Sequence, residues 1–96
     1  MELVSKSIPF VENEKKEVLL HNLPVGKKGR VRKLLNSGQK RRRLLDLGLI
    51  PNSIVKTELI SPLGNPIAYN IRGSVIALRK EETRNVVVEI IDKGES

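Results

Sequence analysis

The sequence predicts a mainly β protein, a small SH3-like antiparallel β-barrel of five to six strands with one short inserted helix. The chain has 96 residues, which is enough for one domain. Its apolar residues are nearly all Val, Leu and Ile in short clusters, and Phe10 and Tyr69 are its two aromatics. Such clusters are typical of strands. Turns rich in Gly and Pro separate them at intervals of roughly 8–12 residues, as in small barrels.

The chain divides into a barrel and two flanking segments. Residues 1–17 mix charged and apolar residues without a clear period, and we interpret them as an N-terminal extension of unknown role. Residues 18–91 hold the regular apolar clusters and form the expected domain. Residues 92–96 are a polar tail. Within the domain, Asn22–Gly26 is a turn by composition, because Pro fixes φ and Gly permits a positive φ.

The first long strand is expected at Gly29–Leu35. Its residues alternate, and this alternation places Val31, Lys33 and Leu35 on one face. Asn36–Gly38 then breaks the pattern.

A helix is expected at Gln39–Leu47, where Gln, Lys, Arg and Leu are all good helix formers. Ser37 is placed as its N-cap, and Gly48 is placed where a left-handed C-terminal cap belongs. Leu44 and Leu45 share one side of this helix. With about two turns available, the helix must pack on the barrel to be stable.

The second half of the domain alternates between strands and turns. In the first of these strands Val55, Thr57 and Leu59 are expected to face one way. Arg79–Asn85 is polar and is expected to form one helical turn. The strands of this half are predicted at Ile54–Ile60, Ile67–Ile71, Val75–Leu78 and Val86–Ile90.

Four blocks of residues follow one another over roughly residues 18–91, namely Leu23–Gly29, Arg41–Pro51, Pro62–Pro66 and Ala77–Glu82. Together they resemble the signature of the FeoA family. Two positions depart from it. The family usually has Gly where Asn52 stands, and Asn tolerates the same left-handed backbone. It usually has Asp where Asn65 stands, so a charge is missing there.

The resemblance implies a cytosolic accessory protein of bacterial ferrous iron uptake. The implied partner is the FeoB-type ferrous iron permease, whose cytosolic part carries a GTPase domain, and no cofactor is implied. The same barrel also resembles the C-terminal domain of DtxR-type metal-dependent repressors. That second likeness bears on the fold more than on the function.

The net charge of +7 is concentrated in one run. Nine of the 18 basic residues lie between Lys27 and Arg43, and no Asp or Glu interrupts them. Such a run is either a solvated surface or a positive face for a partner. Arginine forks suit carboxylates on an acidic protein face. A basic nucleic-acid-binding barrel is the alternative, but few aromatics are present to stack on bases, so no specific nucleic-acid binding is expected.

Enzymatic chemistry finds little support in the sequence, and we expect no catalytic residue and no metal site. His21 is the sole histidine, no cysteine is present, and a ferrous site needs several converging His and carboxylate ligands. Gly26–Gly29 lacks the spacing of a phosphate-binding loop. Glu81 and Glu82 are interpreted as solvated charges. A metal-sensing regulatory domain detached from its repressor stays open as a third function.

The candidate binding residues lie on the predicted helix and in the turn Ser61–Pro66, which we expect to form one surface. Leu63, at the tip of a turn braced by prolines, has few neighbours and would serve as an apolar anchor. Leu49 is a candidate as well, although packing at the end of the core explains it better. The full set is Arg41, Arg42, Arg43, Leu49, Pro62, Leu63 and Asn65.

The location expected from the sequence is the cytoplasm. The N-terminus lacks the apolar run of a signal peptide, and the longest apolar run, Val75–Leu78, is far shorter than the ~20 residues of a membrane span. We therefore expect no membrane insertion. The oligomeric state is left open by the sequence, since an exposed strand edge also permits self-association.

Overall fold

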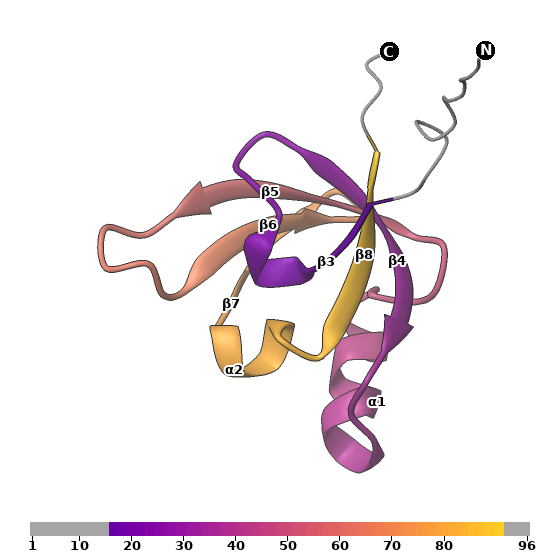
Figure 1. The fold of residues 1–96 in the computed structure, drawn as a ribbon. Coiled ribbons are helices and arrows are strands. Elements are labelled where there is room, and N and C mark those ends of the chain that lie inside the picture. The colour runs from indigo at the N-terminus through magenta and orange to yellow at the C-terminus, as the bar shows by residue number, and fades with distance from the viewer. Residues whose placement is uncertain (1–15, 92–96) are drawn as a thin grey trace, which may run out of the picture.

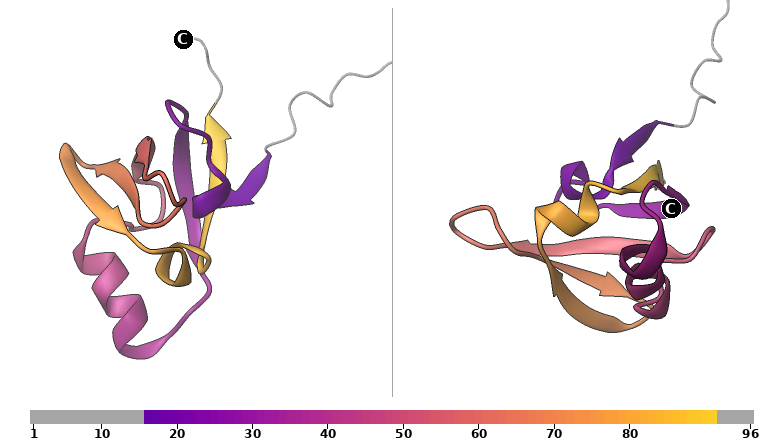
Figure 2. Two further views of the ribbon diagram at one scale, coloured as in Figure 1. Left: turned by 90° about the vertical axis from the view of Figure 1, so that its left-hand side faces the viewer. Right: turned by 90° about the horizontal axis from the view of Figure 1, so that it is seen from below.

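The computed structural model describes residues 16–91, and these form one six-stranded antiparallel sheet that curls around the core (Figure 1). The strand order is β3-β8-β4-β5-β6-β7, so the first and last strands of the described residues lie side by side. Figure 2 shows the curvature of the sheet from two further sides. The strands are β3 (Glu17–Leu19), β4 (Lys28–Leu34), β5 (Ile54–Ile60), β6 (Ile67–Ile71), β7 (Ser74–Leu78) and β8 (Val86–Ile91).

Three short helical segments connect the strands. A single 3-10 turn, Leu20–Asn22, follows β3. The inserted helix α1 (Gly38–Asp46) lies between β4 and β5, and α2 (Lys80–Thr83) lies between β7 and β8. The expected SH3-like fold, its inserted helix and the single helical turn after β7 are confirmed. None of the helices in the described range 16–91 is long and apolar enough to cross a membrane.

The core is aliphatic and surrounds one tyrosine, Tyr69, whose side chain is 0% exposed. The alternation predicted for β6 holds, because Ile67, Tyr69 and Ile71 all point into the core. Thr57 is equally buried, and its hydroxyl donates a 2.9 Å hydrogen bond to the carbonyl of Leu23. The other buried core residues are Leu20, Leu23, Val31, Leu44, Leu49, Val55, Leu78, Val86 and Val88.

Two irregularities in the sheet overturn parts of the predicted face assignments. The ladder between β4 and β8 shifts register between Val31 and Lys33, so Leu34 packs against the core and Leu35 is exposed. The ladder between β5 and β6 shifts between Thr57 and Leu59, and Leu59 is 65% exposed. In each strand one extra residue reverses the direction of every later side chain. Strict alternation therefore failed beyond Val31 and Thr57.

Helix α1 ends in a Schellman motif that the sequence indicated by Gly48. Gly48 has a φ of +106°, and its amide donates to the carbonyl of Leu45 at 2.9 Å. The amide of Leu49 donates to the carbonyl of Leu44 at 3.1 Å, and both leucines are buried in the core. This pair of hydrogen bonds and the apolar contact that accompanies them define the motif. At the other end, Ser37 takes the N-cap position as predicted, without a side-chain hydrogen bond.

The proposed boundaries at the two ends of the domain fall mostly beyond the described part of the chain. Of the extension 1–17, only Lys16 and Glu17 are described, and Glu17 begins β3. The tail 92–96 lies outside the described residues altogether.

Candidate partner-binding surface

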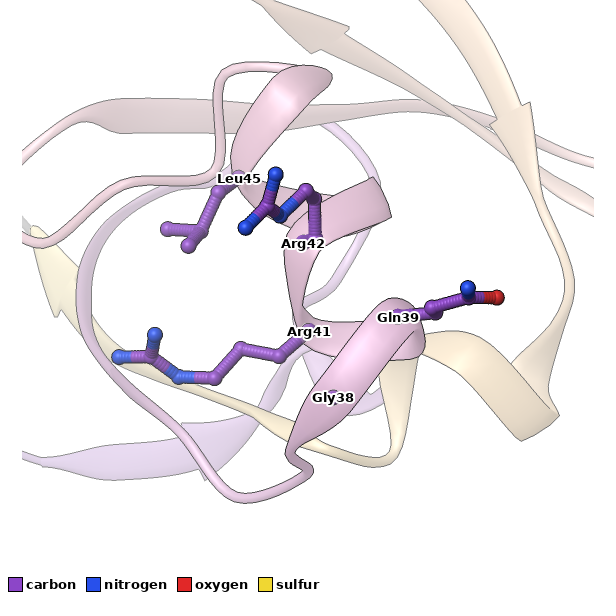
Figure 3. A pocket seen from close by; sticks show the side chains of 5 residues that line it. All are labelled: Gly38, Gln39, Arg41, Arg42 and Leu45. Atoms are coloured by element: carbon purple, nitrogen blue, oxygen red, sulfur yellow. The ribbon is translucent and has the colours of Figure 1, made fainter.

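The exposed side of α1 carries the arginines that the sequence singled out. Arg41 and Arg42 are exposed, whereas Leu44 of the same helix is buried against the barrel. Figure 3 shows the side chains of Arg41 and Arg42 extending from the same side of α1 as Leu45, while Gln39 points away. These residues line a broad concavity of about 570 Å³. No ion pair joins Arg41 or Arg42 to any described residue, so both guanidinium groups are available to a partner.

Arg43 has a different environment from its two neighbours, because it joins α1 to α2. Its Nε donates a 2.8 Å hydrogen bond to Oε2 of Glu82, and the two groups also form an ion pair. The pair crosses a groove of about 190 Å³ between the helices. Lys40 and Arg84 line this groove beside Glu81 and Glu82, so both signs of charge are present. Arg43 is therefore a residue of the groove between the helices more than of the free arginine face.

Glu82 is not the freely solvated charge that the sequence suggested. Its Oε1 accepts a 3.2 Å hydrogen bond from the backbone N–H of Arg79, and this contact caps the start of α2. Partial burial raises the pKa of Glu82, but hydrogen bonds from Arg43 and the Arg79 backbone, with the charges of both arginines, lower it overall. Its neighbour Glu81 is exposed, as expected. Adjacent residues diverge here because one of them faces α1.

The turn between β5 and β6 carries the second group of candidates. Leu63 is 93% exposed at its tip, and Pro62 beside it is also exposed. Asn65 has a structural role, since its Oδ1 accepts a 3.1 Å hydrogen bond from the backbone N–H of Lys80 at the first residue of α2. This hydrogen bond attaches the turn to α2. Asn65 thus helps to hold the turn that carries Leu63.

The structure does not bring α1 and the turn Ser61–Pro66 into one continuous surface. Figure 1 shows the tip of the β5–β6 hairpin at one end of the molecule and α1 at another, with α2 between them. Helix α2 contacts both. Its Lys80 donates a backbone hydrogen bond to Asn65 of the turn, and its Glu82 accepts one from Arg43 of α1. Leu49 lies in the core with 0% exposure, as the packing interpretation expected, and presents no atoms to a partner.

The basic run separates into two parts in three dimensions. One part lies on β4, where Arg32 is within 3.9 Å of Glu17 and within 3.7 Å of Glu89. The other part lies on α1. Exposed pairs such as those of Arg32 contribute little stability, but they lower the local positive potential. The α1 part is therefore the stronger positive feature.

The structure gives nucleic-acid and metal binding no additional support. Tyr69 is fully buried and offers no ring for a base to stack on. His21 is half-buried beside α2, and burial, followed by the charge of Lys80, lowers its pKa. Among residues 16–91, no three His, Cys, Asp or Glu side chains gather into a group that could hold a metal ion.

Sequence reasoning missed the role of α2. Lys80 and Glu82 connect the two candidate regions, and a polar segment of four residues gives little warning of that. The one available signal was the spacing of Arg79 and Glu82, three residues apart at the start of a helical turn. In a capping box a Glu at that spacing accepts the backbone N–H of the first residue, as Glu82 does here. The side chain of Arg79 has no acceptor for the second hydrogen bond of the box.

Comparison with protein families and solved structures identifies relatives over the same residues. The model of the FeoA domain matches residues 18–90. The solution structure of iron(II) transport protein A from Clostridium thermocellum is 31% identical with a TM-score of 0.75, and the match covers 77% of this chain. It spans only 46% of that longer chain. No curated protein matches.

Two further structures extend the comparison. The FeoA protein from Chlorobium tepidum is 32% identical with a TM-score of 0.72, and the match covers 81% of this chain and 76% of that one. IdeR from T. acidophilum has a TM-score of 0.68 at 17% identity, over 77% of this chain and 34% of that one. The second likeness concerns the fold alone, and it confirms the expected resemblance to a repressor barrel.

Proposed function

The chain belongs to the FeoA domain family, which is associated with ferrous iron transport, and from this premise we propose that it is a non-enzymatic accessory module that binds the FeoB-type ferrous iron permease. The contact lies on the cytosolic side of the membrane and supports assembly or regulation of the permease. Any GTP hydrolysis belongs to the GTPase domain of the partner. This role requires a binding surface on the module and no catalytic group.

The observation that carries the proposal is the free arginine face of α1. Arg41 and Arg42 are exposed and form no ion pair with any of residues 16–91, and Leu45 lies beside them at the edge of the same concavity. Guanidinium groups bind carboxylates in a bidentate fashion, and apolar side chains beside them exclude water from the contact. A concavity of this breadth on a helix suits a protein surface better than a small molecule, because small-molecule sites are deep and mostly apolar.

The helix is held rigidly enough to serve as a recognition element. The buried Leu44 and the Schellman motif at Gly48 fix its C-terminal end on the barrel, and Arg43 fixes its middle on α2. Prior ordering of a binding surface lowers the entropy cost of association. The face of α1 that carries Arg41 and Arg42 is therefore held in place before a partner arrives.

The test is a titration of isotope-labelled protein with the soluble cytosolic GTPase domain of the permease from the same organism. At ~0.15 M ionic strength, exposed charges more than ~8 Å apart are largely screened, so shifts report a specific contact. We expect saturable amide shifts in residues 38–47. The double variant Arg41→Ala/Arg42→Ala should bind more than roughly fivefold more weakly, the effect of ~1 kcal/mol or more at an interface centre.

The matched control removes the same charge from another face. Lys28→Ala/Lys33→Ala takes two exposed basic residues from β4 and should leave the affinity close to that of the natural chain. Equal losses in both double variants would show that only net charge matters. Equal affinity in all three proteins would exclude α1 as the contact.

A further inference from the structure

In the sheet formed by residues 16–91, strand β7 is a free edge that lacks the usual protection. It is the last strand in the order β3-β8-β4-β5-β6-β7, and Figure 2 shows it at the outside of the sheet. Its sequence, Ser-Val-Ile-Ala-Leu, contains no charge and no proline, and its ladder with β6 has no register shift. Natural edge strands are commonly blocked by charges, prolines or bulges. The opposite edge, β3, is three residues long and carries Glu17.

The β6–β7 hairpin determines which backbone groups of β7 face outward. Its connection is the two-residue turn Arg72-Gly73, with φ values of +55° and +92°. In such a hairpin the flanking pair exchanges both hydrogen bonds, and the pattern then alternates along the strands. Ser74 and Ile76 are thus bonded to β6, while the N–H and C=O groups of Val75 and Ala77 point to the free edge. Within the described part of the chain, no backbone hydrogen bond from a turn or loop reaches either residue.

The outer face beside this edge is partly apolar, with Asn70 opposite Val75 as its polar part. Val75 is 63% exposed, and Ala77 is exposed as well. Ala77 lies opposite Ala68, and Ala68 lies opposite Leu59, so one apolar row crosses three strands to the edge. A strand added at β7 would extend this row and cover it with its own side chains on that face.

Positive charges stand at both ends of β7. Arg72 precedes the strand, and Arg79 and Lys80 follow it, all three exposed. Neither Arg72 nor Lys80 forms an ion pair with any residue between 16 and 91. A second copy paired antiparallel about Ile76 would set Arg72 against Lys80 of the other copy, and this like-charge contact disfavours self-pairing. The complementary occupant is therefore acidic at both ends.

We propose that β7 binds an extended segment of a partner protein as an additional antiparallel strand, one with β-branched or small residues in its middle and acidic residues at each end. The backbone groups of Val75 and Ala77 supply the hydrogen bonds, and Arg72, Arg79 and Lys80 select the acidic ends. This surface is separate from the arginine face of α1. The proposal goes beyond the docking role of that helix and does not depend on it.

The test uses the full chain and the synthetic peptide Asp-Glu-Val-Thr-Val-Thr-Glu-Asp, with Lys replacing every acidic residue in a control peptide. On titration with the acidic peptide, we expect amide shifts along β7 and slower hydrogen exchange at Val75 and Ala77. The amide of Ile76, already bonded to β6, should change little in exchange rate. The control peptide should bind more weakly.

Variants distinguish the contribution of the backbone groups of β7 from that of the charges at its ends. Ala77→Pro removes an outward N–H and should abolish binding, while Leu59→Thr, on the same face but two strands away, should keep it. If Ala77→Pro fails to fold, Ala77→Asp tests the same contact. Arg72→Ala and Arg79→Ala should each weaken binding by up to roughly fivefold, as expected for exposed ion pairs. Arg41→Ala/Arg42→Ala should have no effect, which distinguishes this site from the docking surface on α1.

Three results would overturn the proposal. The first is equal affinity for the acidic and basic peptides, or no shift in β7 at the solubility limit of the acidic peptide. The second is slow exchange of Val75 and Ala77 in the free monomer, since the edge would then already be covered within the chain. The third is concentration-dependent self-association through β7, which would make a second copy the occupant.

Discussion

The side chain of Arg43 in α1 donates a 2.8 Å hydrogen bond to the carboxylate of Glu82 in α2. The same carboxylate accepts a backbone N–H from Arg79, so Glu82 connects the two helices and caps one of them. Arg43 is 56% exposed, and solvent therefore weakens the ion pair. The role of Glu82 is to fix the geometry of the groove between α1 and α2, with a modest gain in stability.

Acidification should remove the stabilising contribution of Glu82. Its pKa in the folded chain lies below the ordinary value of 4.5, because the hydrogen bonds and positive charges of Arg43 and Arg79 outweigh the effect of burial. A carboxyl group with a lowered pKa stabilises the fold above its unfolded pKa and loses that effect as the pH falls through the folded pKa. Urea unfolding from neutral pH down to acid should show a steeper loss in the natural chain than in Glu82→Gln.

Glu81→Gln is the matched control for that prediction. It removes the same charge from an exposed neighbouring position that makes no ion pair with a described residue. The free energy of unfolding of this variant should depend on pH in the same way as that of the natural chain. A parallel loss in Glu82→Gln would show that the hydrogen bonds of Glu82 do not perturb its titration.

Gly48→Ala should destabilise the chain by roughly 1–3 kcal/mol, the cost of holding a residue with a Cβ in strained backbone. The φ of +106° disfavours any side chain, and an added Cβ would lie 2.8 Å from Cδ of Arg72 and 3.1 Å from Cγ2 of Ile71. Gly26→Ala is the control, because its φ is +85° but no atom lies within 4 Å of the added Cβ. Chemical denaturation of both variants measures the contact apart from the backbone strain. Equal losses would mean that Arg72 and Ile71 move aside.

Truncation to alanine should destabilise the fold at only one of the two leucines that the sequence offered as candidate contacts. Leu49→Ala should cost roughly 2–5 kcal/mol, as for a large-to-small change in a packed core. Leu63→Ala should change the unfolding free energy by less than about 0.5 kcal/mol, because its side chain is 93% exposed. Thermal unfolding separates the two outcomes. A large loss in Leu63→Ala would show that the tip of the β5–β6 turn is packed in solution.

Tyr69 should resist ionisation and lower the stability of the chain in alkali. Burial raises its pKa from 10.0 to about 12, a larger effect than the opposite influence of the Thr83 hydroxyl. A group with a raised pKa stabilises the fold below its unfolded pKa, and the contribution is lost as the pH rises through the folded pKa. Between pH 10 and about 12, the natural chain should therefore lose unfolding free energy faster than Tyr69→Phe.

Two measurements check this behaviour. Tyr69 is the sole tyrosine, so phenolate absorbance reports its ionisation directly. The hydroxyls of Tyr69 and Thr83 are buried without a well-formed hydrogen bond. At pH 7, Tyr69→Phe should therefore change the free energy of unfolding only slightly. A loss of more than ~1 kcal/mol there would reveal a hydrogen bond to the hydroxyl, for instance from a buried water.

The sequence predicted the fold well where local signals were strong. Pro and Gly turns fixed the strand boundaries to within a residue or two, and Gly48 marked the end of α1. It failed where one inserted residue changed the register, since nothing in Arg32 or Glu58 announces a bulge. Leu35 and Leu59 were placed on the wrong face for that reason.

The candidate site was harder to predict, because it depends on contacts between distant residues. The exposure of Arg41, Arg42 and Leu63 followed from pattern and turn chemistry. The contacts of Arg43 with Glu82 and of Asn65 with Lys80 span 39 and 15 residues. Short-range patterns carry no record of such pairs. The free edge at β7 depends likewise on the strand order, which a list of strands does not specify.

The position of β8 determines when the protein is able to fold during its synthesis. This strand, the last of the described strands to leave the ribosome, lies between β3 and β4, the first two strands of the described range. Until Val86–Ile91 has emerged, β3 lacks its pairing strand among the described residues and β4 lacks one of its two neighbours. The nascent chain therefore remains incompletely folded until translation has passed Ile91. A premature stop before β8 would release a polypeptide without the strand that joins β3 to β4, and such a chain would be readily cleaved by cellular proteases.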